Sequence, residues 1–202
     1  MPHLAHLSKD KKLAKIIAQQ EKYKLIKRKN VYLHLCCSIM SQQLSVKVAD
    51  VFQQRFFNLF DTKTPTAAQI LAVPFDTLRS IGLSNAKANY IHNICRFFIE
   101  QDVTDKHLYK MNEEELIIFL TQIKGVGRWT VEMVLMFTLG KEDVFPADDL
   151  GIQQAICKLY NIDATDKKAM KEQMHKVSKK WIPYRTYACR YLWGWKDNSP
   201  GK

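Results

Sequence analysis

The feature that most constrains this chain is a pair of glycines between two segments with helical periodicity. Gly125 and Gly127 form the pair. Apolar or buried-type positions recur at helical spacing on both sides of it, at Leu116, Phe119, Leu120, Ile123, Val131, Val134, Leu135 and Thr138. A turn this tight needs residues without Cβ, so the pattern predicts a helical hairpin over residues 113–139. The amides of residues 126–129 would then point outward at the start of the second helix, where a phosphate binds well.

The chain carries an excess of positive charge, with 31 Lys and Arg against 20 Asp and Glu and a formal net charge of +11. Basic residues are concentrated in residues 9–29 and 167–190, whereas residues 113–115 form an acidic run. Individual lysines usually solvate helix faces, but this asymmetry favours a polyanionic partner. A nucleic acid is the natural candidate, because contacts to its phosphates position a protein without reading sequence.

Length and composition narrow the class of protein. A chain of 202 residues can form one substantial core or two small lobes that share a cleft, and 47% hydrophobic residues are typical of a globular protein. No apolar stretch approaches the roughly 20 residues of a membrane-spanning helix, and the N-terminus lacks a signal-peptide pattern, so we expect neither a membrane partner nor export. The five cysteines are odd in number and lack a Cys-x-x-Cys spacing, and the six histidines lack zinc spacing. We therefore expect reduced thiols in a cytoplasmic protein.

Helical patterns cover most of the chain, and no segment has a convincing strand pattern. We expect helices over residues 9–20, 30–57, 66–73, 75–81 and 85–98, and further helix starts at Asn112, Asp166 and Pro183. Gly140 lies where a glycine would end the second helix of the hairpin. The segment around Gly82 weakly resembles the hairpin, but a simple turn glycine explains it. The sequence therefore predicts an all-α protein with short connections.

A pair of adjacent carboxylates follows the hairpin. Asp149 lies beyond one complete helix and a proline turn, so the chain can fold back and bring it near the hairpin. Aspartate is also a preferred N-cap residue, so Asp149 could simply cap the next helix. Two aspartates allow a division in which Asp148 faces solvent and Asp149 faces a cleft. The residues alone leave both interpretations open.

Four segments of the chain form a pattern that is specific in combination. They are Ser38–Ser45, Ile81–Ala88, the hairpin through Asp149, and Trp181–Ala188 leading to Trp193. Together they resemble the helix-hairpin-helix DNA glycosylase superfamily, and within it the 3-methyladenine DNA glycosylase II group. The resemblance implies that residues 1–202 form a single glycosylase unit. It would be an all-α, two-lobed helical bundle with a helix-hairpin-helix motif and an active-site cleft between the lobes.

The family plan also implies which residues belong to each lobe. Residues 35–109 would form one lobe. Residues 1–34 and 110–202, including the hairpin at 113–139, would form the other. This arrangement would bring the two basic ends of the chain together, in agreement with the distribution of charge.

The resemblance assigns roles to particular residues. Asp149 would be the catalytic carboxylate. The DNA-binding residues would be Gln42, Gln43 and Leu44 in one loop, and Gly125, Val126, Gly127, Arg128 and Thr130 in the hairpin. Carbonyl groups near Gly125 would hold a monovalent cation, and no other cofactor is expected.

One set of side chains would stack on the extruded base, and another side chain would fill the gap that the base leaves in the duplex. Trp129 and Trp193 would stack on the extruded base, although a tryptophan can equally be part of a core. Met133 stands where some relatives have tyrosine. In the loop, one residue would enter the duplex as a wedge. The alignment slightly favours Gln43 over Leu44, and residue 42 would fix the loop by hydrogen bonds.

These roles imply a monofunctional DNA glycosylase that flips out alkylated bases, such as 3-methyladenine and 7-methylguanine, and hydrolyses their N-glycosidic bonds in base excision repair. Relatives that also cleave the strand carry a lysine directly after Gly-Val-Gly-Arg, where this chain has Trp129, so we expect no lyase activity. Other members bind an iron–sulfur cluster through four C-terminal cysteines. Here only Cys157 and Cys189 follow residue 150, so no such cluster is expected.

Two alternatives remain open at this stage. The chain could be a non-catalytic helix-hairpin-helix DNA-binding protein, in which Asp149 is only a cap, or a glycosylase for mismatched or oxidised bases. The sequence does not rank 3-methyladenine, 7-methylguanine, hypoxanthine and ethenoadenine as substrates. We expect a monomer that acts on damaged double-stranded DNA, in the nucleoid of a bacterium or the nucleus of a eukaryote.

Overall fold

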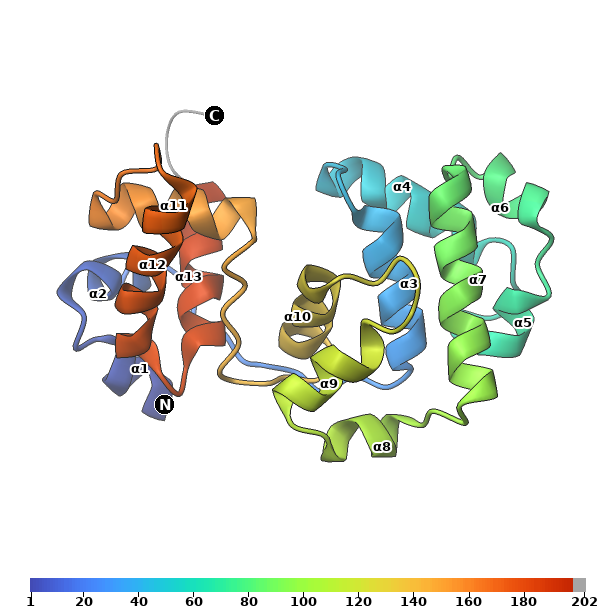
Figure 1. Ribbon diagram of the computed structural model, residues 1–202, viewed down its shortest axis with the longest axis horizontal. Coiled ribbons are helices and arrows are strands. Elements are labelled where there is room, and N and C mark those ends of the chain that lie inside the picture. Colours follow the sequence, from blue (N-terminus) through green and yellow to red (C-terminus); the bar gives the residue numbers. More distant parts are fainter. Residues whose placement is uncertain (198–202) are drawn as a thin grey trace. The chain divides into compact units, whose positions relative to one another are not determined.

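The computed structural model describes residues 1–197, and every regular element in that range is a helix (Figure 1). The chain divides into two compact units. Unit 1 comprises residues 1–26 and the chain from residue 140 onward, and unit 2 comprises residues 27–139. The expectation of an all-α fold is confirmed.

Unit 2 is built around two helices that lie side by side. Its helices are α3 (Val31–Ser41), α4 (Val46–Phe57), α5 (Ala67–Leu71), α6 (Phe75–Ser80), α7 (Asn85–Glu100), α8 (Asp105–Lys110), α9 (Glu113–Leu120) and α10 (Arg128–Phe137). α3 and α7 pack against each other, α5 and α6 cover α7, and α4 and α10 cover α3 (Figure 1). Fully buried residues of this core include Leu35, Ile39, Met40, Ile91, Ile94 and Leu135. Each such side chain stabilises the unit by roughly 1.5–3 kcal/mol.

The helix expected over residues 30–57 is in fact two helices. Residues 42–45 turn between α3 and α4. Within this turn Gln43 has a φ of 60°, a left-handed conformation that a right-handed α-helix cannot contain. Met40, Leu44 and Val48 keep an i,i+4 apolar spacing across the turn, so periodicity alone did not reveal the break. The family resemblance did imply a loop at residues 42–44.

The start of α3 is capped by a residue far away in the sequence. Asn30 occupies the N-cap position, as expected, but its φ is 61° and its side chain makes no cap hydrogen bond. Asp105, at the start of α8, accepts hydrogen bonds from the amides of Asn30 (2.7 Å) and Val31 (3.0 Å) instead. A carboxylate at a helix N-terminus is favourable, and here it also joins α8 to α3.

Other helix starts follow the expected cap chemistry. Thr66 with Gln69 and Asn112 with Glu115 form reciprocal capping boxes. Asp166 accepts hydrogen bonds from two amides at the start of α12. These caps were readable from sequence because each lies within three positions of the amide that it satisfies.

Unit 1 combines the two ends of the chain. Its helices are α1 (Pro2–Leu7), α2 (Lys11–Ile17), α11 (Leu150–Tyr160), α12 (Lys167–Ser178), the 3-10 helix η1 (Lys179–Trp181) and α13 (Arg185–Asp197). α13 packs against both α11 and α2. Asp10, the N-cap of α2, accepts hydrogen bonds from the hydroxyl of Tyr160 (2.7 Å) and from Nε1 of the fully buried Trp181 (3.3 Å). The N-terminal segment is therefore tied into the C-terminal helices by polar contacts as well as apolar ones.

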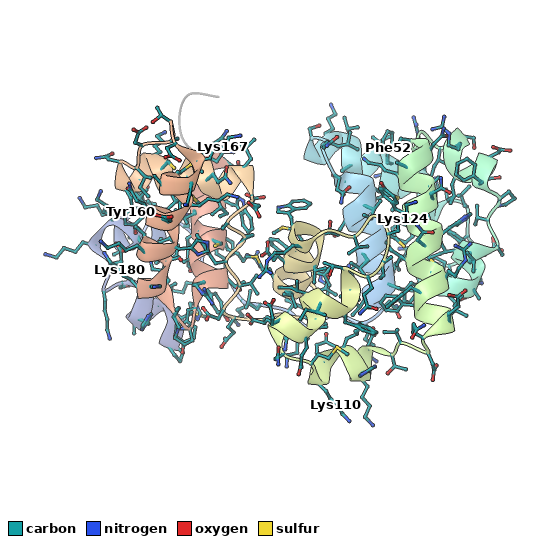
Figure 2. All side chains as sticks on the ribbon, in the orientation of Figure 1. Phe52, Lys110, Lys124, Tyr160, Lys167 and Lys180 are labelled. Atoms are coloured by element: carbon teal, nitrogen blue, oxygen red, sulfur yellow. The ribbon has the colours of Figure 1, made fainter. Side chains whose placement is uncertain are left out.

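Unit 1 holds most of the excess positive charge. Most of residues 9–29 and all of residues 167–190 belong to it. Lysines such as Lys167 and Lys180 extend from its surface (Figure 2). None of the helices in the described part of the chain is long and apolar enough to cross a bilayer.

The observed units differ from the lobes that the family plan implied. Residues 27–34 and 110–139, hairpin included, belong with the middle of the chain in unit 2 and not with the two ends. The reason is packing, because α10 contacts both α9 and α3. In addition, the amide of Arg28 donates to the carbonyl of Thr138 (2.8 Å), which pairs the entry and exit segments of the unit.

Candidate functional site

Asp149 is the N-cap residue of α11, and its carboxylate has two donors on one oxygen. Oδ1 accepts a hydrogen bond from the amide of Ile152 (2.8 Å) and another from the indole Nε1 of Trp193 (2.8 Å). The first bond confirms the capping interpretation. The second bond is not a capping interaction, and it holds the carboxylate by a donor from α13. A cap alone would not require that donor.

The approach of the indole to the carboxylate depends on a glycine in the first turn of α11. A Cβ at Gly151 would lie 2.9 Å from Nε1 of Trp193 and 3.0 Å from Oδ1 of Asp149. Such contacts are too short for unrelaxed neighbours, so a side chain at this position would displace one of the two groups. The role of Gly151 was not predicted from the sequence. Its signal was a glycine inside a helix, which costs about 1 kcal/mol relative to alanine and often has a packing reason.

The two adjacent aspartates differ in environment. Asp148 is exposed and forms an ion pair with Lys171 of α12. Asp149 is half-buried and faces Trp193. Of these two aspartates, Asp149 is the one whose carboxylate is held by donors from two helices, α11 and α13.

The expected hairpin is formed by α9, a turn over residues 121–127 and α10. Gly125 has a φ of 104°, and a Cβ there would lie 2.1 Å from the ring of Tyr90. Both the left-handed backbone and the packed ring therefore require glycine. Tyr90, on α7, is a second residue that sequence reasoning did not identify.

The expectation that both glycines are needed to make the turn is wrong for Gly127. Its φ is −91°, a value that any residue adopts, and a Cβ there would meet nothing within 4 Å. Gly127 is the N-cap residue of α10. A side chain is therefore absent at the point where a helix N-terminus meets open space, and a phosphate could approach the first amides of α10 closely.

Three of the other hairpin residues named from sequence have contacts within unit 2. The side chain of Val126 is buried, and its amide donates to the carbonyl of Ile123 (2.9 Å), so this amide does not point outward as expected. Arg128 forms ion pairs with carboxylates of α9 and α10. Thr130 is 1% exposed, and its Oγ1 accepts a hydrogen bond from Nε2 of Gln42 (2.9 Å). These contacts fix the hairpin and leave the start of α10 as its outward-facing surface.

Trp129 and Met133 line a cavity of about 350 Å³ within unit 2, a size typical of small-ligand pockets. Both are half-buried, unlike the core residue Trp181. Burial lowers the pKa of His34 in the cavity wall, with a contribution from Arg28. Burial also raises the pKa of the neighbouring Cys37 thiol to about 11. The imidazole and the thiol are therefore uncharged at neutral pH, which suits an aromatic ligand.

The loop between α3 and α4 presents the wedge candidates. Gln43 is exposed and Leu44 is half-buried. The carbonyl of Gln42 accepts a hydrogen bond from Nζ of Lys87 (2.9 Å). The side chain of Gln42 donates a hydrogen bond to Thr130. The interpretation of residue 42 as the one that fixes the loop agrees with these bonds.

The candidate residues fall into two groups. Unit 2 brings together the loop, the hairpin and the cavity of Trp129 and Met133. Unit 1 brings together Asp149 and Trp193. Among residues 1–197, no three His, Cys, Asp or Glu side chains gather in an arrangement that could hold a metal ion.

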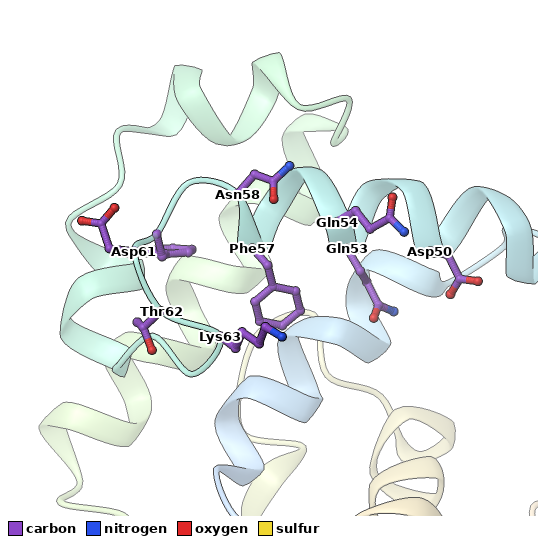
Figure 3. Close-up of a pocket in the computed structure, with 9 residues that line it drawn as sticks. Asp50, Gln53, Gln54, Phe57, Asn58, Asp61, Thr62 and Lys63 are labelled. Carbon is purple, nitrogen blue, oxygen red and sulfur yellow. The ribbon is translucent and has the colours of Figure 1, made fainter.

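A further hollow of unit 2 contains none of these candidates. It has a volume of about 600 Å³ and lies between α4 and the segment after it, lined by Asp50, Gln53, Phe57, Asn58, Asp61 and Lys63 among others (Figure 3). Its volume exceeds that of the cavity at Trp129, but none of the residues implicated by the family resemblance lines it. We therefore place the candidate site on the residues described above.

Comparison with known proteins identifies related sequences. The family model described as "HhH-GPD superfamily base excision DNA repair protein" matches residues 36–181. The chain is 35% identical to DNA-3-methyladenine glycosylase 1 of Schizosaccharomyces pombe, over 95% of this chain and 84% of that protein. It is 34% identical to a putative DNA-3-methyladenine glycosylase of Bacillus subtilis, over 94% of this chain and 67% of that protein.

Solved structures agree with these matches. The structure of S. pombe 3-methyladenine DNA glycosylase in complex with abasic DNA has a TM-score of 0.88 and 32% identity, and the match covers 100% of both chains. A DNA-3-methyladenine glycosidase from Bacillus halodurans has a TM-score of 0.83 and 31% identity, over 98% of this chain and 90% of that one.

Proposed function

Because the chain belongs to the HhH-GPD superfamily of base excision DNA repair proteins, we propose that it is a DNA glycosylase that excises alkylated bases. The relatives that cover most of its length are named DNA-3-methyladenine glycosylases. The observation that carries the proposal is the carboxylate of Asp149, which is held by the indole of Trp193. The substrate locates the reaction at the chromosome, in a nucleoid or a nucleus.

In the proposed reaction the bond between C1′ of the deoxyribose and the base nitrogen breaks, and the bonding electrons leave with the base. Positive charge develops on the sugar, and the carboxylate of Asp149 stabilises it electrostatically. A water molecule then forms the new bond to C1′ and loses a proton toward the carboxylate. The products are a free base and an abasic site.

The nature of the leaving base explains why one carboxylate is sufficient. A base alkylated at a ring nitrogen is already cationic, so it departs as a neutral molecule without a general acid. Trp129 and Met133 would contact the extruded base, and the cavity beside them offers an aromatic face and uncharged polar groups. The ring of Trp193, whose Nε1 donates to Asp149, would also stack on the base.

The hairpin and the loop would contact the rest of the substrate. A DNA phosphate would approach the start of α10, where Gly127 leaves open space. One residue of Gln43 and Leu44 would enter the duplex, and the exposure of Gln43 supports that residue. We propose that a single copy of the chain binds one damaged site in double-stranded DNA.

A monovalent cation at the hairpin is compatible with its carbonyl groups. The carbonyl oxygens of Ile123 and Lys124 accept hydrogen bonds from the Val126 amide and from Nδ2 of Asn93, and each keeps a second lone pair. We propose that carbonyl oxygens near Gly125 would provide the ligands for such an ion. The cation would supply positive charge toward a DNA phosphate.

We propose that the enzyme resembles the II type of this activity and lacks strand-cleaving lyase chemistry. A lyase of this superfamily needs an amine after the hairpin turn to form an imine with the sugar, and Trp129 cannot provide one. Borohydride added during the reaction should therefore trap no covalent protein–DNA adduct. A trapped adduct would show that another amine attacks the sugar.

The test of the proposed function is base release. Purified protein is incubated with methylated duplex DNA, and the free bases are separated and identified. Release of 3-methyladenine or 7-methylguanine supports the proposal. Binding of DNA without release of any alkylated base would favour a non-catalytic DNA-binding protein, and release of only oxidised or mismatched bases would assign a different substrate.

A further inference from the structure

Lys87 lies on α7, and its side chain caps the C-terminus of α3. Its ammonium donates hydrogen bonds to the carbonyls of Met40 and Gln42, each at 2.9 Å. The last carbonyls of α3 have no partners within the helix and carry the negative end of its dipole, so an ammonium group there is favourable. The backbone of Lys87 is itself fixed, because its amide donates to Oγ of the N-cap residue Ser84 (3.2 Å).

A second tether joins the same loop to the hairpin. Nε2 of Gln42 donates to Oγ1 of Thr130 at 2.9 Å, and Thr130 is buried in the first turn of α10. A third contact lies just before the loop, where Nε2 of Gln53 donates to Oγ of Ser41 (3.0 Å). The loop is thus held from α4, α7 and α10, all within unit 2.

Between these tethers Gln43 is exposed and has a φ of 60°. A non-glycine residue in this left-handed region is energetically unfavourable, and it persists where its surroundings over-determine the backbone. The carbonyl and the side chain of Gln42 are both fixed by hydrogen bonds, and this explains why the left-handed backbone of Gln43 persists. Burial lowers the pKa of Lys87. The ammonium group therefore loses part of its hydration at this position, whereas a fully solvated lysine would not.

We propose that Lys87 and Thr130 are positioning residues that hold the loop of residues 42–44 in the conformation in which it enters a damaged duplex. This inference rests on the proposed function. A loop that is already ordered loses less conformational entropy when it replaces an extruded base. Because Thr130 lies on the helix whose N-terminus would hold a phosphate, the loop and the phosphate contact keep a fixed relation within unit 2.

The test uses two variants that each remove one tether. Lys87→Met removes the ammonium group, and Thr130→Val removes the hydroxyl at nearly the same volume. The matched controls are Lys106→Met, which removes one exposed lysine of unit 2, and Thr130→Ser, which keeps the hydroxyl. Circular dichroism melting establishes that each variant folds, and if Lys87→Met does not fold, Thr130→Val decides the question.

The measurement compares binding to two duplexes of the same sequence. One contains a tetrahydrofuran abasic-site analogue opposite 2-aminopurine, and the other is undamaged. We expect each tether variant to lose about tenfold in affinity for the lesion duplex and no more than about twofold for the undamaged one. The 2-aminopurine fluorescence, which reports unstacking at the lesion, should fall in parallel, and both controls should retain the wild-type preference.

Three results would overturn the inference. They are an equal loss on both duplexes, an unchanged preference in both tether variants, and a wild-type protein with no preference for the lesion. None of these measurements requires base release. A wild-type protein that prefers the lesion but excises no base would therefore refute the proposed function while leaving the role of the tethers supported.

Discussion

The indole Nε1 of Trp193 donates a hydrogen bond of 2.8 Å to Oδ1 of Asp149, which lies 44 positions earlier in the chain. The same oxygen accepts the amide of Ile152 at the start of α11. Two donors from different helices fix the orientation of the carboxylate. A carboxylate that is already oriented needs little reorganisation when positive charge develops beside it, and such preorganisation is a major source of catalysis.

Trp193→Phe removes the donor and retains an aromatic ring. A hydrogen bond to a charged group contributes roughly 1.5–3 kcal/mol, so the single-turnover rate of base release should fall roughly tenfold to a hundredfold. Trp195→Phe on the same helix is the matched control, and it should keep the rate because the Trp195 ring forms a cation–π contact with Lys158, whose Nζ lies 5.3 Å from the ring centroid. Equal rates in the Trp193 variant and the wild type would remove the indole from the mechanism.

Gly151→Ala tests the same contact without replacing either of its two partners. The new Cβ would lie 2.9 Å from Nε1 of Trp193, so the indole or the carboxylate must move and the single-turnover rate should fall. The fold should tolerate the change, because alanine is about 1 kcal/mol better than glycine in a helix. In the Trp193→Phe background the same substitution should have much less effect, because the two changes act on one contact. Additive losses in the double variant would argue against this explanation.

The two hairpin glycines should respond differently to alanine. Gly125→Ala places a Cβ 2.1 Å from the Tyr90 ring at a φ of 104°, so the melting temperature should drop by several degrees. Gly127→Ala should leave the melting temperature nearly unchanged, since no atom lies within 4 Å of the new Cβ, and should weaken binding to damaged and undamaged duplexes alike. Undiminished DNA affinity in the folded Gly127 variant would refute the phosphate role.

Local features of this fold were predictable from the sequence. The caps at Thr66, Asn112 and Asp166, and the hairpin itself, depend on residues within a few positions of each other. Asp149 as a cap belongs to the same class of feature. Apolar periodicity and the preference of certain residues for N-cap positions predict such local features directly.

Contacts between distant segments were not predictable in the same way. Nothing near Asn30 indicates that Asp105 caps α3, and nothing near Gln42 indicates that Lys87 holds its carbonyl. Helical periodicity alone did not reveal the break between α3 and α4, although the family resemblance implied a loop there, and the left-handed residue in that loop is a glutamine. The need for Gly125, by contrast, was predicted correctly, although the ring of Tyr90 behind it was not.

The stability of unit 1 should depend on pH through Asp10. Burial raises the pKa of this carboxyl group, but hydrogen bonds from the Tyr160 hydroxyl, the Leu13 amide and the Trp181 indole outweigh that effect. The folded-state pKa therefore lies below the unfolded value of about 3.9. The ionised group stabilises the fold above that value, and this contribution is lost as the pH falls through the folded-state pKa.

Urea unfolding of the wild type and of Asp10→Asn between about pH 6 and pH 2 measures this effect. The difference in the free energy of unfolding between the two proteins should be largest at the upper end of the range and should shrink at the lower end. A difference that is constant across the range would mean that the charge of Asp10 contributes nothing.

The most direct test of the account is the single-turnover rate of base release by Asp149→Asn on methylated duplex DNA. Asparagine caps helices about as well as aspartate and can accept the indole hydrogen bond, so stability and DNA affinity should hold or the affinity should rise. The rate should fall by roughly a hundredfold or more, because the negative charge beside the sugar is lost. Asp148→Asn, which removes only an exposed ion pair with Lys171, should release bases at nearly the wild-type rate. Wild-type rates in both variants would contradict the central claim and leave Asp149 as a helix cap alone.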